Sequence, residues 1–578
     1  MSELARTLPA SWYRSLPLYQ LERRGVFLKS WYLLGPVTRF LNVDEGVEYE
    51  IAQQHIYAFR TTTNGPFPGP GDIKVIVAKD GTELRNHVTP TGLVFATLSD
   101  DAPSFHEFYP DLEPLLQRVD FTQRPYRRTI KYEGNFNWKT MVDGYQECLH
   151  CQYTHPSFSV YYPPTFYTVY NHKNFSQHVA DPKKPDDGLF LYFFPNCTLN
   201  VYGGGMSSFR VCPTADPNVT RMEFDYYHME SGDKFEDYYK FVRQVAMEDF
   251  ELCEKAQENL QKGVYNEGIL NPEKETGVAF YQERVFDLVC EQYEAEKLKL
   301  VQTEIEPEIS AISSNGRAEQ QEKELSRTGR ALSSSQTSEK ITQSTVAKES
   351  EFPDNWWNGK DVFELERRAI FSKTWLYVSH RSRFNKPGDY HSLEIAGFPV
   401  FLILECGSST VLGCRYHGWS YNTRGDLIKA PHFEDVPGFD KSQNGLFEIH
   451  AHTSKYGMIF INLDASPSVP EVDSSQPNNF AAAHRLAVDS TWVAGWTLEG
   501  HFNWKMAESQ YDILLHLKNH LKLEKTMGHE VFPTLRPSTR SSKSLQADIL
   551  CKELDCKDKA AFDTKASTTP KRNEILAW

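Results

Sequence analysis

An internal repeat constrains the fold of this chain more than any other feature of its sequence. Residues 9–40 recur as residues 353–384 at a constant offset of 344 positions, with Leu-Glu-Arg-Arg and spaced tryptophans at equivalent places. Residues 133–139 recur as residues 499–505 at an offset of 366 positions. A repeat of this kind predicts one structural plan that is built twice along the chain. The larger second offset indicates that the second copy holds 22 residues that the first copy lacks.

Two imidazoles and two carboxylates lie close together in the first copy, directly after the second repeated motif. Asp143, Glu147 and His150 are spaced at i, i+4 and i+7, so they would share one face of a continuous helix. Pro156 disfavours helical geometry at His155, which lets that side chain turn towards the same face. The spacing therefore predicts that both imidazoles reach one metal ion.

A third candidate ligand, Asp249, lies farther along the chain. Residues 232–262 predict a long amphipathic helix, and Asp249 falls within its apolar stripe. A buried carboxylate needs a positive partner, because desolvating it unpaired costs several kcal/mol. With His150 and His155 it would complete the two-histidine, one-carboxylate arrangement that holds non-haem Fe(II) and leaves positions open for oxygen and substrate. The apolar residues of the stripe are Val242, Val245, Ala246, Leu252, Cys253, Ala256 and Leu260.

Other interpretations of these residues stay open. His150 and His155 also fit hydrogen-bonded core histidines, and Asp249 also fits a salt bridge with a distant Lys or Arg. Cys148 and Cys151 have the spacing of half a structural zinc site, but the chain contains no second Cys-x-x-Cys. We therefore interpret both thiols as helix packing residues.

Together these motifs resemble the catalytic domain of Rieske-type oxygenases, and most closely the choline monooxygenase-like branch. The resemblance implies that His150, His155 and Asp249 bind a mononuclear Fe(II). It also implies that Glu147 connects this iron to a cluster ligand on a neighbouring subunit. Asp143 matches an acidic position behind the ligands.

Such an oxygenase receives its electrons from a [2Fe-2S] centre that is held by a Cys-x-His pair and a Cys-x-x-His pair. Cys414 and His417, followed by Gly-Trp-Ser-Tyr, resemble the second pair and lie where the second copy has its extra residues. The first pair is missing, since His391 and Cys406 are not spaced as Cys-x-His. No cysteine precedes Cys148, so the first copy cannot hold a Rieske centre. We expect that this chain assembles no stable cluster by itself.

The second copy also departs from the pattern of the metal ligands. His516 stands at the position of His150, but Ser509 and Ile513 stand where the first copy has its two carboxylates. We therefore interpret His516 and His520 as surface residues of a helix.

The predicted fold class is α+β. Short apolar segments at 74–78, 91–96 and 457–461 predict small antiparallel modules. The resemblance implies a β-rich Rieske-like module followed by a catalytic domain of helices on a large antiparallel sheet, repeated twice and incomplete. The chain is then a true tandem protein or a mispredicted fusion of two oxygenase genes. The predicted domains are a truncated Rieske-like module without cluster ligands (1–118), a mononuclear iron catalytic domain (119–302), a polar linker (303–350), a Rieske [2Fe-2S] module lacking its first ligand pair (351–495) and a truncated catalytic remnant with a polar tail (496–578).

Composition narrows the class of protein further. The net charge is −15, from 62 Lys and Arg against 77 Asp and Glu, which argues against a nucleic-acid-binding surface. No apolar run approaches the length of a membrane span, and the N-terminal residues lack the pattern of a signal peptide. Ten cysteines without framework spacing indicate a reducing compartment, so we expect a cytoplasmic enzyme that binds no membrane.

The expected activity is hydroxylation of a small organic substrate with O2, using electrons from NAD(P)H that arrive through a separate reductase or a ferredoxin. The resemblance also implies a homo-oligomer, usually a trimer. Aromatic faces attract quaternary ammonium groups, so aromatic side chains around the iron would favour choline or a related compound. Two alternatives stay open: the aromatic residues pack in the sheet and core, and the chain is a catalytically impaired metal-binding remnant. The aromatic candidates are Tyr161, Tyr162, Phe166, Tyr167, Tyr170, Tyr192, Phe193 and Phe194.

Overall fold

The chain forms two compact units. The first contains Met1–Thr337 together with Val411–Leu446, and the second contains Ser338–Thr410 together with Phe447–Trp578. Linker residues 314–350, Cys406 and residues 508–574, which include His516 and His520, lie outside the part of the chain that the structure describes. The computed structural model describes residues 4–163, 165–181, 183, 188–263, 265–313, 355–405, 411–495, 500–507 and 575–577.

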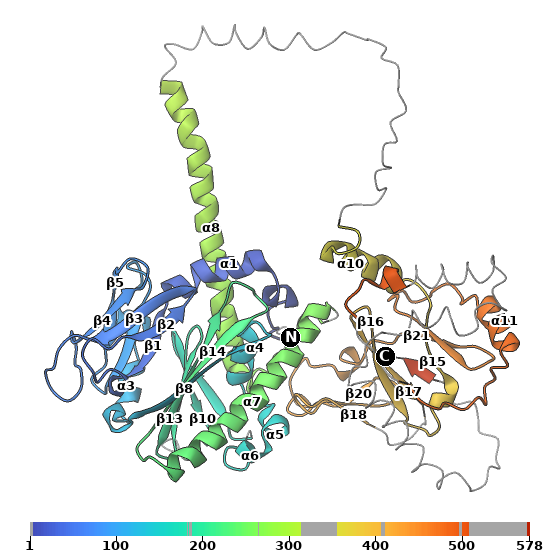
Figure 1. Ribbon diagram of the computed structural model, residues 1–578, viewed down its shortest axis with the longest axis horizontal. Coiled ribbons are helices and arrows are strands. Elements are labelled where there is room, and N and C mark those ends of the chain that lie inside the picture. Colours follow the sequence, from blue (N-terminus) through green and yellow to red (C-terminus); the bar gives the residue numbers. More distant parts are fainter. Residues whose placement is uncertain are drawn as a thin grey trace, which may run out of the picture. The chain divides into compact units, whose positions relative to one another are not determined.

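A seven-stranded antiparallel sheet forms the centre of the first unit (Figure 1). Its strand order is β8-β14-β13-β12-β11-β10-β9. The β12–β13 hairpin turns at Gly203 and Gly204, whose φ angles of 59° and 78° suit the tight turn that twisted strands require. The strands are β8 Tyr126–Gly134, β9 Thr168–Asn171, β10 Phe175–Val179, β11 Leu189–Phe193, β12 Cys197–Tyr202, β13 Gly205–Pro213 and β14 Thr220–His228.

Both faces of this sheet are buried. Helix α7 (Asp233–Lys262) crosses one face, where the Phe250 ring lies 5.1 Å from the Tyr132 ring between centroids. The other face packs against two short helices, α2 (Phe105–Phe108) and α3 (Leu112–Leu116), in a separate apolar cluster. Helix α7 confirms the helix predicted for residues 232–262, and helices on a large antiparallel sheet agree with the predicted α+β class.

The N-terminal part of the first unit adds two smaller sheets. Their strand orders are β1-β7-β6 and β2-β3-β4-β5. The predicted strands at 74–78 and 91–96 appear as β4 and β7, shifted by one or two residues. The elements are α1 Leu16–Gly25, β1 Trp31–Pro36, β2 Val47–Ile51, β3 Gln54–Arg60, β4 Ile73–Val77, β5 Glu83–Leu84, β6 Asn86–Val88 and β7 Leu93–Thr97.

The second unit contains two three-stranded sheets, β15-β22-β21 and β16-β17-β23. The predicted strand at 457–461 appears as β22. None of the helices in the described ranges of either unit is long and apolar enough to cross a membrane. The elements are α10 Lys360–Glu366, β15 Leu376–His380, β16 Tyr390–Ile395, β17 Phe398–Leu404, β21 His450–Thr453, β22 Met458–Asn462, α11 Ser475–Ala483 and β23 Ile575–Ala577.

In the first unit, the repeated motifs contact one another across more than 100 residues of sequence. The Glu22 carboxylate of α1 accepts hydrogen bonds from Trp138 Nε1 at 2.9 Å and from Lys139 Nζ at 2.6 Å. Both members of the Lys139–Glu22 ion pair are 0% exposed. Arg23 Nε, next to this pair, donates to the carbonyl of Ala52 at 2.9 Å.

The same contacts occur in the second unit. Glu366 accepts hydrogen bonds from Trp504 Nε1 at 2.8 Å and from Lys505 Nζ. Arg367 Nε donates to the carbonyl of Ala396 at 2.6 Å. The two units therefore connect their repeated motifs in the same way, through a carboxylate on an N-terminal helix.

We predict that Glu22→Gln destabilises the first unit by about 3 to 5 kcal/mol, because it leaves the Lys139 ammonium buried without a charge partner. Hydrogen–deuterium exchange followed by mass spectrometry should show faster exchange in α1 and in the helix that begins at Trp138. The matched control is Glu296→Gln, which removes the half-exposed pair between Arg24 and Glu296 and should cost about 1 kcal/mol or less. Equal exchange in the two variants would contradict the importance of the buried pair.

Candidate metal centre

The segment that carries the candidate ligands is not one continuous helix. Helix α4 (Trp138–Tyr145) begins at Asn137, whose side chain accepts a hydrogen bond from the Lys139 backbone at 3.1 Å. Two further short helices follow, α5 (Cys151–Thr154) and α6 (Pro156–Ser159). The prediction of a shared helix face was therefore wrong: of its three members, Asp143, Glu147 and His150, only Asp143 lies on α4.

Tertiary hydrogen bonds of Gln146 explain where α4 ends. The fully buried Gln146 amide donates to the carbonyl of Gly277 at 3.2 Å and accepts from His178 Nε2 at 2.9 Å. Just beyond it, the Glu147 carboxylate accepts a hydrogen bond from the Leu149 backbone. These contacts replace the helical hydrogen bonds that the backbone gives up after Tyr145.

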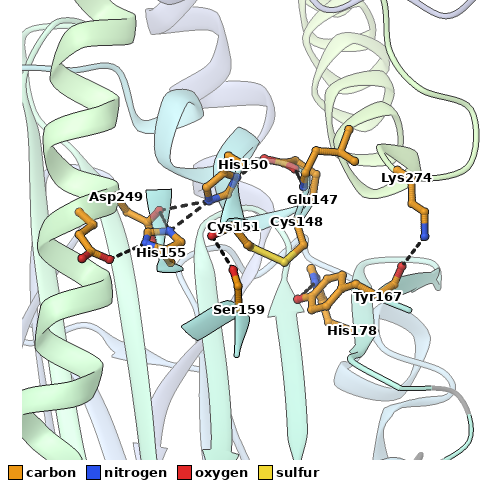
Figure 2. Close-up of a disulfide and its surroundings, with 12 residues drawn as sticks. Glu147, Cys148, His150, Cys151, His155, Ser159, Tyr167, His178, Asp249 and Lys274 are labelled. Atoms are coloured by element: carbon orange, nitrogen blue, oxygen red, sulfur yellow. Dashed lines mark hydrogen bonds and ion pairs between the residues drawn. A yellow bond between two sulfur atoms is a disulfide. The ribbon is translucent and has the colours of Figure 1, made fainter. Parts of the chain in front are cut away.

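His150, His155 and Asp249 nevertheless converge on one point (Figure 2). His155 Nε2 lies 3.2 Å from His150 Nε2 and 2.8 Å from Asp249 Oδ1, and His150 Nε2 lies 3.4 Å from the same Asp249 oxygen. Ligands on adjacent octahedral positions, each about 2.1 Å from an ion, lie about 3 Å apart. The three side chains therefore fit an iron ion. His155 has φ −119° and ψ 65°, outside the helical region, in agreement with the effect expected of the following proline.

Carboxylates outside this triad orient both imidazoles. Glu147 Oε1 contacts His150 Nδ1, and Glu248 Oε2 lies 2.8 Å from His155 Nδ1. An Nδ1–H that donates to a carboxylate leaves the Nε2 lone pair directed at the metal position. Both His side chains are buried, whereas Asp249 is 28% exposed and faces a cavity.

The charges of this cluster favour a cation. Burial lowers the pKa of His150, but Glu147 and Asp249 outweigh burial and raise it to about 10. Burial raises the pKa of Asp249, yet His155 and His150 hold it well below its usual range. Three carboxylates thus surround two imidazoles. A divalent ion would supply the positive charge that bound protons otherwise provide.

The two acidic residues that the resemblance singled out have different surroundings. Glu147 lies beside His150, and although burial raises its pKa, His150 and His417 lower it to about 2. Asp143 accepts hydrogen bonds from Tyr13 at 2.8 Å and from Gln282 at 2.6 Å and contacts none of the three candidate ligands in the hydrogen bonds of the described residues. Burial, partly offset by these bonds, raises the pKa of Asp143 to about 6.

A cavity of about 110 Å³ opens beside the triad. Seven Phe and Tyr side chains line it, and Asn200 and Ser207 add polar groups from the sheet. Sequence reasoning missed most of these residues. Four of them, Phe190, Tyr202, Phe209 and Phe224, lie on strands and meet through strand register rather than through spacing along the chain. The aromatic residues of the wall are Phe158, Tyr167, Phe190, Tyr202, Phe209 and Phe224, together with Tyr145 from α4.

Of the predicted aromatic candidates, Tyr167 lines the cavity. Tyr192, Phe193 and Phe194 pack in the core, as the alternative interpretation predicted, and are at most 1% exposed. Tyr161, Phe166 and Tyr170 lie on the surface, and Tyr162 packs behind the wall against Phe158 and Phe190.

Cys148 and Cys151, which precede and follow His150 in the sequence, form a disulfide (Figure 2). This finding corrects the interpretation of two free packing thiols. While this disulfide is intact, neither sulfur can bind zinc as a thiolate. Both residues are buried and line the same cavity as the triad.

Residues 411–446, which belong to the first unit, pack against the triad loop. His417 Nε2 lies 3.9 Å from Glu147 Oε1, and the Tyr416 ring stacks on His150 with centroids 5.9 Å apart. Leu149 lies in an apolar cluster with Leu427, Ala430 and Phe433. The small sheet of this segment is made of β18 Leu412–Gly413, β19 Ser420–Tyr421 and β20 Leu427–Lys429.

The described residues do not fit a complete Rieske cluster. Cys414 is a free, exposed thiol three residues before His417, so one Cys-x-x-His pair is present. The Cys-x-His spacing occurs once within the described ranges, at Cys148 and His150, but that cysteine is in the disulfide and that histidine is in the triad. Cys406 falls outside the described ranges. Such a cluster needs two cysteines and two histidines.

Comparison with known proteins identifies the central region. Residues 122–185 and 168–291 match the family model "Ring hydroxylating alpha subunit (catalytic domain)". The oxygenase subunit of carnitine monooxygenase from Acinetobacter pittii (strain PHEA-2) is 27% identical over 187 residues, which are 28% of this chain and 49% of that protein. Chlorobenzene dioxygenase subunit alpha from Cupriavidus sp. (strain PS12) is 26% identical over 186 residues, 27% of this chain and 40% of that protein.

A crystal structure of a quaternary ammonium Rieske monooxygenase in complex with L-carnitine superposes with a TM-score of 0.44 at 19% identity, covering 49% of this chain and 96% of that chain. The chain spans about half the length of the curated relatives that it matches. The family match lies over the sheet, α4 and α7, which carry or adjoin the three candidate ligands. Residues 122–291 are therefore similar to the catalytic domain of ring-hydroxylating oxygenase alpha subunits.

Proposed function

We propose that the predicted domain 119–302 is the catalytic domain of an iron-dependent oxygenase that hydroxylates a small quaternary ammonium compound. The convergence of His150, His155 and Asp249 beside an aromatic cavity carries this proposal. Bound Fe(II) would supply dioxygen activation, because two histidines and one carboxylate leave coordination positions open.

The protein's own residues orient the ligands and the substrate. Glu147 and Glu248 hold the two imidazoles through Nδ1. Asn200 is held by Tyr145, whose hydroxyl donates to its side-chain oxygen at 2.7 Å. We infer that this amide binds a substrate hydroxyl while the aromatic walls exclude water.

The cavity chemistry favours a cation without a carboxylate. Aromatic faces such as those of Phe190 and Tyr202, stacked with centroids 5.5 Å apart, attract a trimethylammonium group. Among the described residues that line this cavity there is no Lys or Arg to pair with a substrate carboxylate. We therefore propose choline, rather than carnitine, as the type of substrate.

Electrons would have to reach this site from a reductase or a ferredoxin, and we propose a homo-oligomer by analogy with the family. The matched contacts of Glu22 and Glu366 support the proposal that the chain holds two incomplete copies of one plan. A second candidate function is a metal-binding remnant that turns over poorly. The lone Cys414–His417 pair favours that candidate.

We predict that His150→Ala, His155→Ala and Asp249→Asn each lower Fe(II) affinity at least tenfold, because each removes one of three protein ligands. Glu248→Gln should weaken binding by about 10- to 100-fold through loss of imidazole orientation. Anaerobic Fe(II) titration with metal analysis would measure both effects. His55→Ala, a change at an exposed histidine paired with Glu48, is the control and should bind iron normally. Wild-type iron content in all of the ligand variants would refute the triad.

For the substrate, we predict that choline binds and that its neutral isostere 3,3-dimethylbutan-1-ol binds at least threefold more weakly, because only choline gains a cation–π interaction of about 1 kcal/mol or more. Tyr202→Leu should remove most of this difference while leaving iron binding intact. Calorimetric titration of the iron-loaded protein measures both ligands. Equal affinity for the two ligands in the wild-type protein would contradict the cation–π proposal and favour a neutral substrate.

We also predict that this polypeptide alone assembles no stable [2Fe-2S] centre, because each iron of the cluster would lack half of its protein ligands. Insertion of a Cys-x-His loop between Leu404 and Cys414 should restore the absorption of a Rieske centre. Cys414→Ser in the loop-restored chain should abolish that absorption and serves as the control. A stoichiometric Rieske signal from the unchanged chain would mean that another subunit completes the site.

A further inference from the structure

We propose that the N-terminal part of the chain holds a second metal ion, Zn²⁺, on His87, His106 and Glu113. Two groups of three candidate ligands with atoms within 4.8 Å of one another occur in the described part of the chain. One is the triad of the candidate metal centre. The other is this group, which shares no residue with the cavity of that centre.

The three candidate zinc ligands come from three different elements, β6, α2 and α3. His87 lies on β6 and pairs with Phe95 of β7 in the sheet register. His106 lies on α2, which a capping box between Ser104 and Glu107 stabilises at its N-terminus. Glu113 lies in the first turn of α3, whose Leu112 and Leu116 are 0% exposed. Because buried residues fix all three backbones, little ordering is needed to bind an ion.

The side-chain geometry is close to that of a zinc site. His87 Nε2 lies 3.2 Å from Glu113 Oε1, and two ligands on a tetrahedral zinc lie about 3.3 Å apart. The His87 ring stacks on Phe105 with centroids 4.0 Å apart and planes at 15°, which fixes its orientation. The His106 ring stands edge-on to His87 with centroids 5.1 Å apart, and one of its ring nitrogens lies within 4.8 Å of the ligand atoms of His87 and Glu113.

The donor chemistry selects the kind of metal. Two imidazoles and one carboxylate match borderline ions such as Zn²⁺, whereas Mg²⁺ and Ca²⁺ prefer oxygen ligands alone. His87 and Glu113 are 24% and 27% exposed, so water has access to a fourth position.

A zinc ion here would hold two very short helices against the sheet. Helices α2 and α3 contain four and five residues, too few to be stable by themselves. An ion that joins both helices to β6 would therefore stabilise residues 86–116 against local unfolding. The competing explanation is an ordinary His87–Glu113 ion pair beside a stacked aromatic ring. The two explanations differ in the role of His106: the zinc site requires this imidazole as a ligand, whereas the ion pair does not involve it.

The test is zinc binding to the full chain, measured by equilibrium dialysis with ZnCl₂ and compared with MgCl₂. The His150→Ala/His155→Ala chain isolates the second site, and we expect one Zn²⁺ per chain beyond any bound by exposed thiols such as Cys290. Adding His106→Ala or Glu113→Gln should weaken this binding at least tenfold. Adding His172→Ala, which removes an imidazole 3.9 Å from the single carboxylate of Asp111, should leave it unchanged.

A second measurement keeps the proposal testable if the double variant does not fold. In the wild-type chain, Zn²⁺ but not Mg²⁺ should slow hydrogen exchange in residues 86–116, and His106→Ala should abolish that protection. His106 is exposed, so its replacement leaves the fold intact. Zinc stoichiometry and protection that are the same with and without His106 would overturn the proposal. Because this site is independent of the triad, iron binding at the triad does not affect the outcome.

Discussion

The buried ion pair between Glu22 and Lys139 is the interaction on which the region around the candidate metal centre depends. It connects the N-terminal helix to the first turn of α4, and Trp138 donates a further hydrogen bond to the same carboxylate. Because neither charge reaches water, each stabilises the fold only while the other stays in place. The chain leaves the helix at the end of α4, and this point sets the positions of Glu147 and His150. The position of the metal ligands therefore follows from packing far from the metal.

A second constraint acts at the triad itself. Helix α7 is held on the sheet by Phe250 and presents Asp249 and Glu248 to the two imidazoles. Carboxylates on α7 and in the loop after α4 thus meet at one point, although repulsion between like charges would otherwise separate them. Imidazolium protons or a divalent ion can neutralise this repulsion. A metal ion does so without requiring both facing Nε2 atoms to carry protons, so the charge distribution itself favours a metal site.

Sequence patterns predicted the parts of this architecture that depend on local physics. The period of apolar residues located α7 and Asp249, and Pro156 predicted the non-helical backbone at His155. The continuous helix failed because Gln146 makes tertiary hydrogen bonds that no local pattern contains. The aromatic wall was missed for the same reason: Phe190 and its neighbours meet through strand register. The triad could be predicted from spacing, whereas the shape of its cavity depends on the assembled sheet.

Comparison of the two units separates structural from chemical roles within one motif. The contacts made by Glu22 recur at Glu366, and the contact of Arg23 with a turn carbonyl recurs at Arg367. The second copy keeps these contacts although Ser509 and Ile513 stand where the first copy has carboxylates. The Leu-Glu-Arg-Arg and Asn-Trp-Lys motifs therefore stabilise the fold, and they persist where the metal chemistry does not. A motif search that relied on them alone would find the fold but not the candidate metal ligands, which follow α4.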